Sequence, residues 1–362
     1  MTASSRIRFP ELGIYLLPGH TDRPADVLDE VRDAESLGLG SAWISERFDV
    51  KEVGALSGAA AAITSRIWIG TGVTNVDTRH PLVLASLATT MSRLSGGRFA
   101  LGVGRGIGIR SGMMGLAPVT NAKLTEFASL MRRLWAGERV VGHDGALGKF
   151  PYLHQAAWMK ESIPLLMTAF GERSLEFAGS VFDGVILHTF MSDEAVSRAV
   201  ALVRRGAEKA GRDPAKVLVW TVLAVACDAS EERQLKLITA RMATYLQAPQ
   251  YGELLFAINR WDPAGLARFR ASEVVRSVPG GIDSAATPEQ LRRIRELMPE
   301  EWLPAAVGSP AQCARRIEDQ FAAGADGVIL HASPAREAAP AVEAYAKIRP
   351  AARAAARSPR PA

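Results

Sequence analysis

Short, continuously apolar runs alternate with longer amphipathic runs along almost the whole chain, and this alternation most constrains the fold. The apolar run Leu12–Pro18 precedes a stretch with apolar residues at helical spacing, and Ser41–Ser45, Ile67–Val73 and Arg98–Gly104 repeat the arrangement. Strands that are apolar throughout are typical of a parallel sheet that is covered on both faces. The pattern therefore predicts an α/β protein with parallel strands.

Four further apolar runs complete a set of eight predicted strands: Ile163–Ala169, Asp183–His188, Lys216–Ala226 and Asp326–His331. For a chain of 362 residues, eight β/α units predict a closed (β/α)8 or TIM barrel, whose active site lies at the C-terminal strand ends. A doubly wound open sheet is the alternative that the periodicity leaves open. We expect one domain over residues 1–349 and a disordered tail over 350–362.

The hexapeptide DGVILH occurs twice, at Asp183–His188 and at Asp326–His331. As strands six and eight, the copies need only about 60 residues between them, at about 30 per unit. The longer spacing predicts a helical insertion after strand seven, over about 228–306, at the mouth of the barrel. A smaller insertion after helix 4 reads as a hairpin with Asp144-Gly145 at its turn.

Each copy of the hexapeptide is interpreted in two parts. A preceding glycine, Gly179 or Gly324, is expected to end a helix, and the Asp-Gly-Val-Ile-Leu portion is expected to be structural. The final histidine lies at the C-terminal end of a strand, which faces the active site of a TIM barrel. His188 is therefore a candidate catalytic residue, and His331 is a weaker one.

Composition narrows the functional class. The net charge of +5 comes without a basic stripe that carries interleaved aromatic residues, so nucleic-acid binding is not expected. The longest apolar run is far short of the roughly 20 residues that a membrane-spanning helix needs, and the start lacks an apolar signal segment. The two cysteines predict a reducing, cytoplasmic compartment. No His-x-His pair or other His/Asp cluster indicates a metal site, which disfavours a metal-dependent hydrolase.

Two glycine-containing loops follow predicted strands. Leu101–Gly108 fails the dinucleotide-binding fingerprint, because Ile107 stands where a glycine is required and a loop follows where a helix should open. This loop instead predicts a close approach of the backbone to a flat or bulky ligand. Gly171 stands near the start of a helix, whose free N–H groups and dipole suit a phosphate, with Arg173 adding charge.

Three segments resemble the bacterial-luciferase-like flavin or deazaflavin oxidoreductases: SAWISERFD after the second strand, Ile67–Gly106, and Val307–His331. The resemblance implies a barrel that binds FMN or the deazaflavin coenzyme F420 in its mouth, and a homodimer. It implies hydride transfer between a small organic substrate and the central ring of the coenzyme, at C5 of a deazaflavin.

The resemblance also implies roles for individual residues. Gly72-Val73 would be a non-prolyl cis peptide that bulges under the coenzyme ring. The residues that would line the ring and its pyrimidine edge are Glu46, Thr74, Asn75, Arg105 and Gly106. Those that would meet the phosphate are Ala169, Gly171, Glu172 and Arg173.

Two departures from the family pattern bear on the reaction. Arg47 stands where sugar-phosphate dehydrogenases of the family have a histidine base, and Ile107 stands where they have an acid. An arginine cannot accept the alcohol proton, because it stays protonated at physiological pH. An F420-dependent reductase is therefore favoured, with its proton supplied by water, His188, Tyr15 or Glu46. The charges of Arg47, Arg105 and Arg173 are expected to suit the anionic tail of the coenzyme.

Two other readings stay open at this point. An FMN-dependent monooxygenase would use the same fold with a different coenzyme, and a non-catalytic barrel would only bind the coenzyme. The identity of the coenzyme separates the first reading from the deazaflavin enzyme, because a deazaflavin does not readily form the oxygen adduct that a monooxygenase needs.

Overall fold

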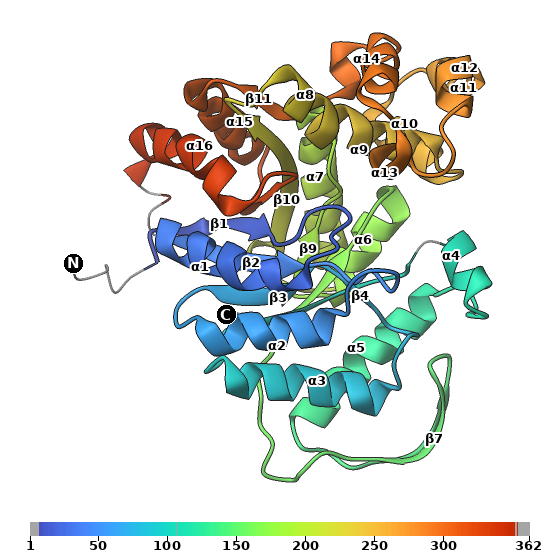
Figure 1. The fold of residues 1–362 in the computed structure, drawn as a ribbon. Coiled ribbons are helices and arrows are strands. Elements are labelled where there is room, and N and C mark those ends of the chain that lie inside the picture. The colour runs from blue at the N-terminus through green and yellow to red at the C-terminus, as the bar shows by residue number, and fades with distance from the viewer. Residues whose placement is uncertain (1–6, 107, 352, 354–362) are drawn as a thin grey trace.

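Parallel strands close into a barrel in a computed structural model that describes residues 7–106, 108–351 and 353 (Figure 1). Its eight strands are β1 (Phe9–Tyr15), β2 (Leu39–Ile44), β3 (Trp68–Thr71), β5 (Phe99–Gly104), β8 (Leu165–Thr168), β9 (Gly184–Ile186), β10 (Leu218–Cys227) and β12 (Gly327–His331). The pairing of β12 with β1, which puts Val328 opposite Leu12, closes the ring. The predicted TIM barrel is confirmed. Most of the expected tail, residues 352 and 354–362, lies outside the described residues.

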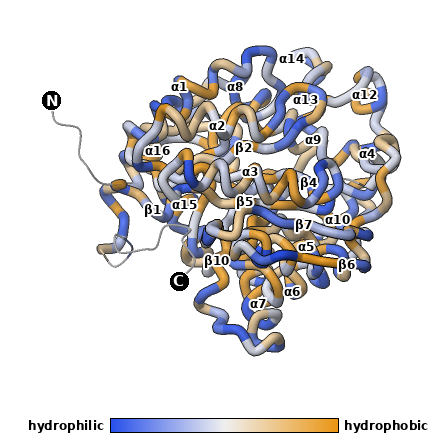
Figure 2. The backbone as a smooth tube through the Cα atoms, turned by 90° about the horizontal axis from the view of Figure 1, so that it is seen from below, coloured by the Kyte–Doolittle hydropathy of each residue, from blue (hydrophilic) through white to orange (hydrophobic). Residues whose placement is uncertain are grey.

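A layer of helices surrounds the strands: α1 (Val27–Leu37), α2 (Val53–Ile63), α3 (Pro81–Leu94), α5 (Asn121–Trp135), α6 (Glu172–Val181), α7 (Asp193–Lys209), α15 (Pro310–Ala322) and α16 (Ala335–Ile348). Helix α1 shows why they form. It buries Val27, Val31 and Ala34 on one face and ends at Gly38, whose left-handed conformation no larger residue adopts easily. Hydrophobic and hydrophilic positions alternate along these helices, as expected for elements with one buried face (Figure 2).

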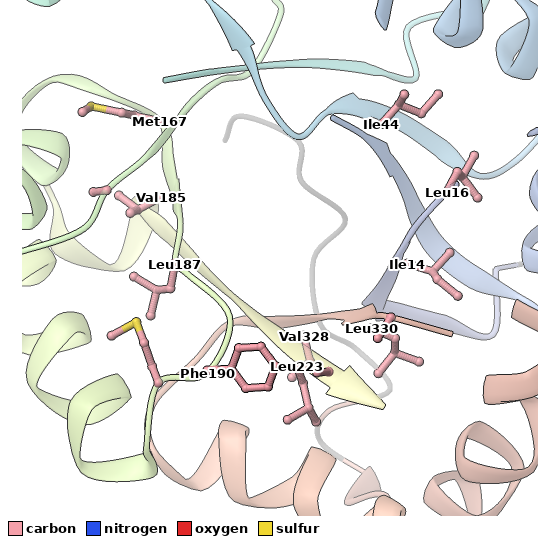
Figure 3. Packing of buried hydrophobic residues seen from close by; sticks show 14 of the residues in the cluster. Ile14, Leu16, Ile44, Met167, Val185, Leu187, Phe190, Leu223, Val328 and Leu330 are labelled. Atoms are coloured by element: carbon pink, nitrogen blue, oxygen red, sulfur yellow. The ribbon is translucent and has the colours of Figure 1, made fainter. Parts of the chain in front are cut away.

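The strands are apolar on both faces because each face meets its own layer of the core. Side chains such as Ile14, Met167 and Leu330 point outward toward the helices (Figure 3). A second cluster fills the interior of the barrel: Trp43, Trp68, Ala100, Leu166, Ile186, Trp220, Val222 and Ile329. Two buried layers remove the period-two alternation of a half-exposed sheet, which explains the continuous apolar runs.

Both copies of the hexapeptide split between the two layers. In the first copy Val185 and Leu187 pack outside the barrel while Ile186 points inside. The preceding glycines differ, however. Gly324 follows α15 with φ +102°, as predicted, whereas Gly179 lies inside α6 and the prediction that it ends the helix was wrong. A Cβ on Gly179 would lie 2.0 Å from the carbonyl oxygen of Val203, so close packing of α6 on α7 accounts for this glycine.

Helices follow one another between β10 and the short strand β11 (Ala306–Gly308), and they gather on one side of the barrel (Figure 1). They are α8 (Glu231–Gln234), the π-helix η3 (Leu235–Thr239), α9 (Ala240–Gln247), α10 (Tyr251–Asn259), α11 (Pro263–Ala271), α12 (Glu273–Arg276), α13 (Ile282–Ala285) and α14 (Pro288–Glu296). No helix among the described residues is long and apolar enough to cross a membrane.

After α5 the chain forms the hairpin of β6 (Val140–Gly145) and β7 (Gly148–Leu153), which extends away from the barrel (Figure 1). Its turn is Ala146–Leu147 rather than the predicted Asp144-Gly145, because Gly145 pairs with Gly148. The N–H of Leu147 donates to the Glu126 carboxylate on α5 at 2.5 Å. A tertiary contact thus sets the register that turn propensity alone assigned wrongly.

Candidate active site

A cis peptide bond between Gly72 and Val73 lies at the mouth of the barrel, where β3 ends and β4 (Thr74–Asn75) begins. Its position is the one that the family resemblance implies. The N–H of Gly72 donates to the carbonyl oxygen of Ile44 at 2.7 Å, and the carbonyl of Val73 accepts from the N–H of Glu46 at 3.1 Å. A Cβ on Gly72 would lie 2.9 Å from the Tyr15 ring, so this glycine lets the tyrosine pack directly on the peptide.

Glu46 holds the strand that follows the cis peptide. Its fully buried carboxylate accepts from Thr74 Oγ1 at 2.9 Å, from Arg79 at 2.6 Å and from the N–H of Val53 at 3.1 Å. The last bond supports the first turn of α2, and Arg79 compensates the buried negative charge. The structure therefore places this predicted catalytic residue within a network that positions β4.

The loop after β5 lies beside β4. The Arg105 guanidinium donates to the carbonyl of Val119 at 2.7 Å and to the Asn121 side chain, and it lies over the Phe177 ring. Gly106 has φ +76°, and a Cβ there would lie 3.1 Å from Asn75 Oδ1. Asn75, Arg105 and Gly106 line one hollow, whereas Ile107 lies outside the described residues.

The predicted phosphate residues follow β8 and open α6. Ala169 is buried with its N–H donating to the carbonyl of Ile186 at 3.3 Å, and Gly171 has φ +86° just before the first helical turn. Glu172 and Arg173 occupy that turn and are exposed. Thr168 Oγ1, at the end of β8, is buried without a hydrogen-bond partner among the described residues. A Cβ on Gly104 of β5 would lie 3.4 Å from this hydroxyl and 2.9 Å from the Val73 side chain, so the hydroxyl lies on the side of the cis peptide.

His188 lies in a group of aromatic rings. Its Nε2 is 2.7 Å from the hydroxyl of Tyr251, its Nδ1 is 2.6 Å from the carbonyl of Thr189, and its ring stacks on Phe170 at 4.7 Å. Tyr245 packs edge-on at 4.9 Å. Burial lowers the pKa of His188 to about 4, so the imidazole is neutral at physiological pH.

Tyr245 and Tyr251 are site residues that sequence reasoning missed. Both come from the helical segment after β10, on α9 and α10, which matches the family pattern only in its placement. Nothing in the local sequence marks them, because only the fold brings these helices over the end of β9. Tyr15, the third predicted catalytic residue, contacts His331 edge-on at 5.2 Å, and burial raises the pKa of the Tyr15 hydroxyl.

The three arginines that were expected to serve one anionic tail do not lie together. Arg105 and Arg173 are near α6, whereas Arg47 follows β2 and lies 3.4 Å from His20, which follows β1. Strands β3 and β5 separate β2 from β8 in the barrel. The mouth therefore has two separate cationic regions.

Comparison with known proteins agrees with this geometry. A family model described as luciferase-like monooxygenase matches residues 10–327. The chain belongs to this family. The resemblance of the SAWISERFD and Ile67–Gly106 segments is thereby confirmed.

Named relatives and a solved structure are similar over much of this chain. It is 34% identical over 218 residues to the 5,10-methylenetetrahydromethanopterin reductase of Methanolobus tindarius, across 59% of this chain and 64% of that protein, slightly under two thirds of its length. It is 27% identical over 302 residues to the F420-dependent glucose-6-phosphate dehydrogenase of Kineococcus radiotolerans, across 73% and 86%. The coenzyme F420-dependent tetrahydromethanopterin reductase of Methanopyrus kandleri superposes with a TM-score of 0.75 over 94% of this chain and 98% of that one, at 22% identity, which shows a shared fold.

Proposed function

We propose that this protein is an F420-dependent oxidoreductase that transfers a hydride between C5 of the deazaflavin and a small organic substrate, with reduction of the substrate as the favoured direction. The observation that carries the proposal is the packing of Tyr15 on Gly72 at the mouth, beside the hollow lined by Asn75, Arg105 and Gly106. The relatives whose names specify F420 support the choice of coenzyme. A cytoplasmic homodimer is the expected setting.

The residues present fit such a coenzyme at both of its ends. The ring would lie on Gly72-Val73, flanked by Asn75, Arg105 and Gly106, and a Cβ on Gly106 would lie 2.9 Å from Ser111 Oγ and 3.1 Å from Asn75 Oδ1. The phosphate would meet the opening turn of α6, where Gly171 leaves open space and Arg173 supplies charge. Thr168 Oγ1, which lies near Gly104 and lacks a partner among the described residues, would face the ring rather than the phosphate.

A small hollow lies beside the proposed position of the coenzyme ring. The hollow lined by Asn75, Arg105 and Gly106 has a volume of about 20 Å³, whereas sites for organic ligands are usually about 300–1,000 Å³. Met114, on the loop that borders this hollow, is exposed. This hollow is one edge of the proposed ring site, since Gly72, Val73 and Tyr15 do not line it.

When bound, F420 supplies the hydride donor and acceptor carbon. The chain supplies the positions of the protons around it. Tyr15 keeps its proton because burial raises its pKa, so its hydroxyl can donate one hydrogen bond toward a ligand above Gly72. His188 is neutral and shares its Nε2 with Tyr251, while Glu46 is occupied by Thr74, Arg79 and the N–H of Val53. Of the three, Tyr15 is therefore the favoured hydrogen-bond donor toward a substrate, whereas its raised pKa disfavours complete transfer of the proton.

Titration of the purified protein with F420 and separately with FMN, followed by tryptophan fluorescence, tests the proposal. We expect micromolar binding of F420 and no saturable binding of FMN. Arg173→Gln should weaken F420 binding about threefold to tenfold, through loss of one charge at the phosphate. Arg133→Gln, an exposed arginine on α5, is the matched control and should leave the affinity unchanged.

The outcomes separate the remaining readings. Binding of FMN alone would replace the proposal with a flavin-dependent monooxygenase. Binding of F420 without hydride exchange, measured by loss of the 5-deuterium label from reduced F420 across a panel of conjugated ketones and enones, would favour a non-catalytic coenzyme carrier. Binding of neither would overturn the assignment of the site.

A further inference from the structure

We propose that the side of the mouth formed by β1, β2 and α9 is a subsite for an anionic group of the substrate, most simply a carboxylate, and that Arg47 is its principal ligand. This inference rests on the proposed function, because it takes the organic substrate to lie above the cis peptide. It goes further by naming the chemical class of that substrate.

The side chains of this subsite converge from three separate elements. Arg47 follows β2, Arg241 comes from α9, and His20 lies on the loop after β1. Asp283 links the last two, 2.8 Å from Arg241 and 3.6 Å from His20. Arg47 is 3.4 Å from the same His20 ring. These side chains converge at the mouth from distant segments of the chain, so the tertiary structure holds them in place as a group.

The charges in the subsite do not balance. Asp283 pairs with Arg241, and Lys51 is held by the carbonyl of Leu17 at 2.7 Å near Glu30. Among the residues that the structure describes, no carboxylate lies within ion-pair distance of Arg47. Arg47 is also only partly exposed, so water compensates its charge incompletely. An anion bound here would supply the missing partner.

The electrostatic effects on neighbouring groups show the same excess of positive charge. Burial and the Arg47 charge lower the pKa of Lys51 to about 7. Burial, followed by the charges of Arg241 and Arg47, also lowers the pKa of His331. His331 contacts Tyr15, and Tyr15 packs on Gly72. The rings of His331 and Tyr15 thus connect this subsite to the Gly72-Val73 peptide, above which the coenzyme ring is proposed to lie.

The position of the subsite favours the substrate over the coenzyme as the source of the anion. The coenzyme phosphate is assigned to α6, which follows β8, and β3 and β5 lie between β8 and β2. Arg241 lies over the Tyr245 ring at 5.9 Å, and Tyr245 contacts His188. The Arg47 subsite therefore borders the rings of Tyr245 and His188. A conjugated organic acid could place its carboxylate on Arg47 and its apolar part on these rings.

Matched pairs of neutral and anionic probes test this inference. Benzoate, cinnamate and 2-naphthoate, each with its primary amide, are titrated calorimetrically into the protein with and without saturating F420. We expect at least one acid to bind about tenfold or more tightly than its amide, as for a charge-assisted bond to a guanidinium. Arg47→Gln should remove this preference, and Arg47→Lys should retain part of it.

Two controls keep the result decisive. Arg336→Gln, at an exposed arginine of α16, should leave the acid preference intact. Arg47→Gln should change the F420 dissociation constant less than twofold, whereas a tenfold loss would assign Arg47 to the coenzyme tail and overturn the inference. Equal affinities for acids and amides in the wild type, or a preference that survives in Arg47→Gln, would also overturn it.

The test separates failure of the inference from failure of the proposed function. If F420 does not bind, the proposed function fails, and the titrations without coenzyme still decide whether Arg47 selects anions. If F420 binds and the acids show no advantage, only the inference fails. Circular dichroism and thermal unfolding of both Arg47 variants establish that they fold.

Discussion

The two copies of DGVILH are identical in sequence and equivalent in the barrel, yet they end in different surroundings. The aspartates of the two copies make equivalent contacts. Asp183 accepts from the N–H of Leu165 at 2.9 Å and from Arg132, and Asp326 accepts from the N–H of Val219 at 2.7 Å and from Arg204. Each carboxylate thus fixes the start of the neighbouring strand through one backbone bond and a close ion pair, and Asp183 has a second, longer ion pair with Arg212 at 3.7 Å.

The histidines differ because different elements cover them. His188 is bonded at both ring nitrogens and enclosed by aromatic rings, two of them from the helices after β10. His331 has an Nδ1 that is buried without a partner among the described residues, and it contacts Tyr15 beside the cis peptide. A repeated segment can therefore specify the same strand and serve two different parts of one site.

The glycines of the two copies should respond very differently to added volume. A Cβ on Gly327 would lie 2.3 Å from the ring of Trp220, which is enclosed in the barrel interior, whereas a Cβ on Gly184 would lie 3.0 Å from its first neighbour. We expect Gly327→Ala to lower the free energy of unfolding by about 3 kcal/mol and Gly184→Ala by about 1 kcal/mol. Urea denaturation measures both. Equal losses would show that the barrel interior repacks around Trp220.

Low pH should lower the free energy of unfolding, because His188 is buried in its neutral form. The folded protein keeps His188 neutral, with its pKa at about 4, while the unfolded chain takes up the proton near pH 6.5. The free energy of unfolding should therefore fall as pH falls from 6.5 to 4, by about 2 kcal/mol for this partly exposed ring. In His188→Gln, this part of the pH-dependent fall in the free energy of unfolding should be absent. Unfolding free energies of wild type and variant at pH 6.5 and 4.5 test this, and parallel losses in both would contradict it.

The smallest predicted effect concerns the shared function of the aspartates. Asp183→Asn and Asp326→Asn keep an oxygen for the strand N–H but lose the charge facing Arg132 or Arg204, so each should cost about 1–2 kcal/mol of unfolding free energy. Asp144→Asn, at an exposed pair with Lys149 in the hairpin, should cost less than about 0.5 kcal/mol. Losses at Asp183 and Asp326 that differ by more than about 1 kcal/mol would show that the two copies are not structurally equivalent.

Much of the candidate site could be predicted because strand ends carry it. The family resemblance implied the roles of Gly72, Asn75, Arg105 and Gly106, and in the structure the last three line one hollow while Gly72 packs on Tyr15. The grouping of Arg47 with the other arginines failed. Sequence order shows that a residue follows a strand, but not toward which neighbour its long side chain turns.

The sequence by itself determined the barrel and the strand ends, because continuous apolar runs and turn residues act locally on the backbone, and the family resemblance implied the position of the cis peptide. Only the tertiary structure decided how Glu46 is occupied, which rings enclose His188 and which cations surround Arg47. The partners of Glu46 come from β4, Arg79 and α2, whereas the surroundings of His188 and Arg47 depend on α9, α10 and α13. Most of these contacts join residues far apart in the chain. Distant contacts leave no periodic signal in the sequence, so the barrel could be predicted while its substrate-facing wall could not.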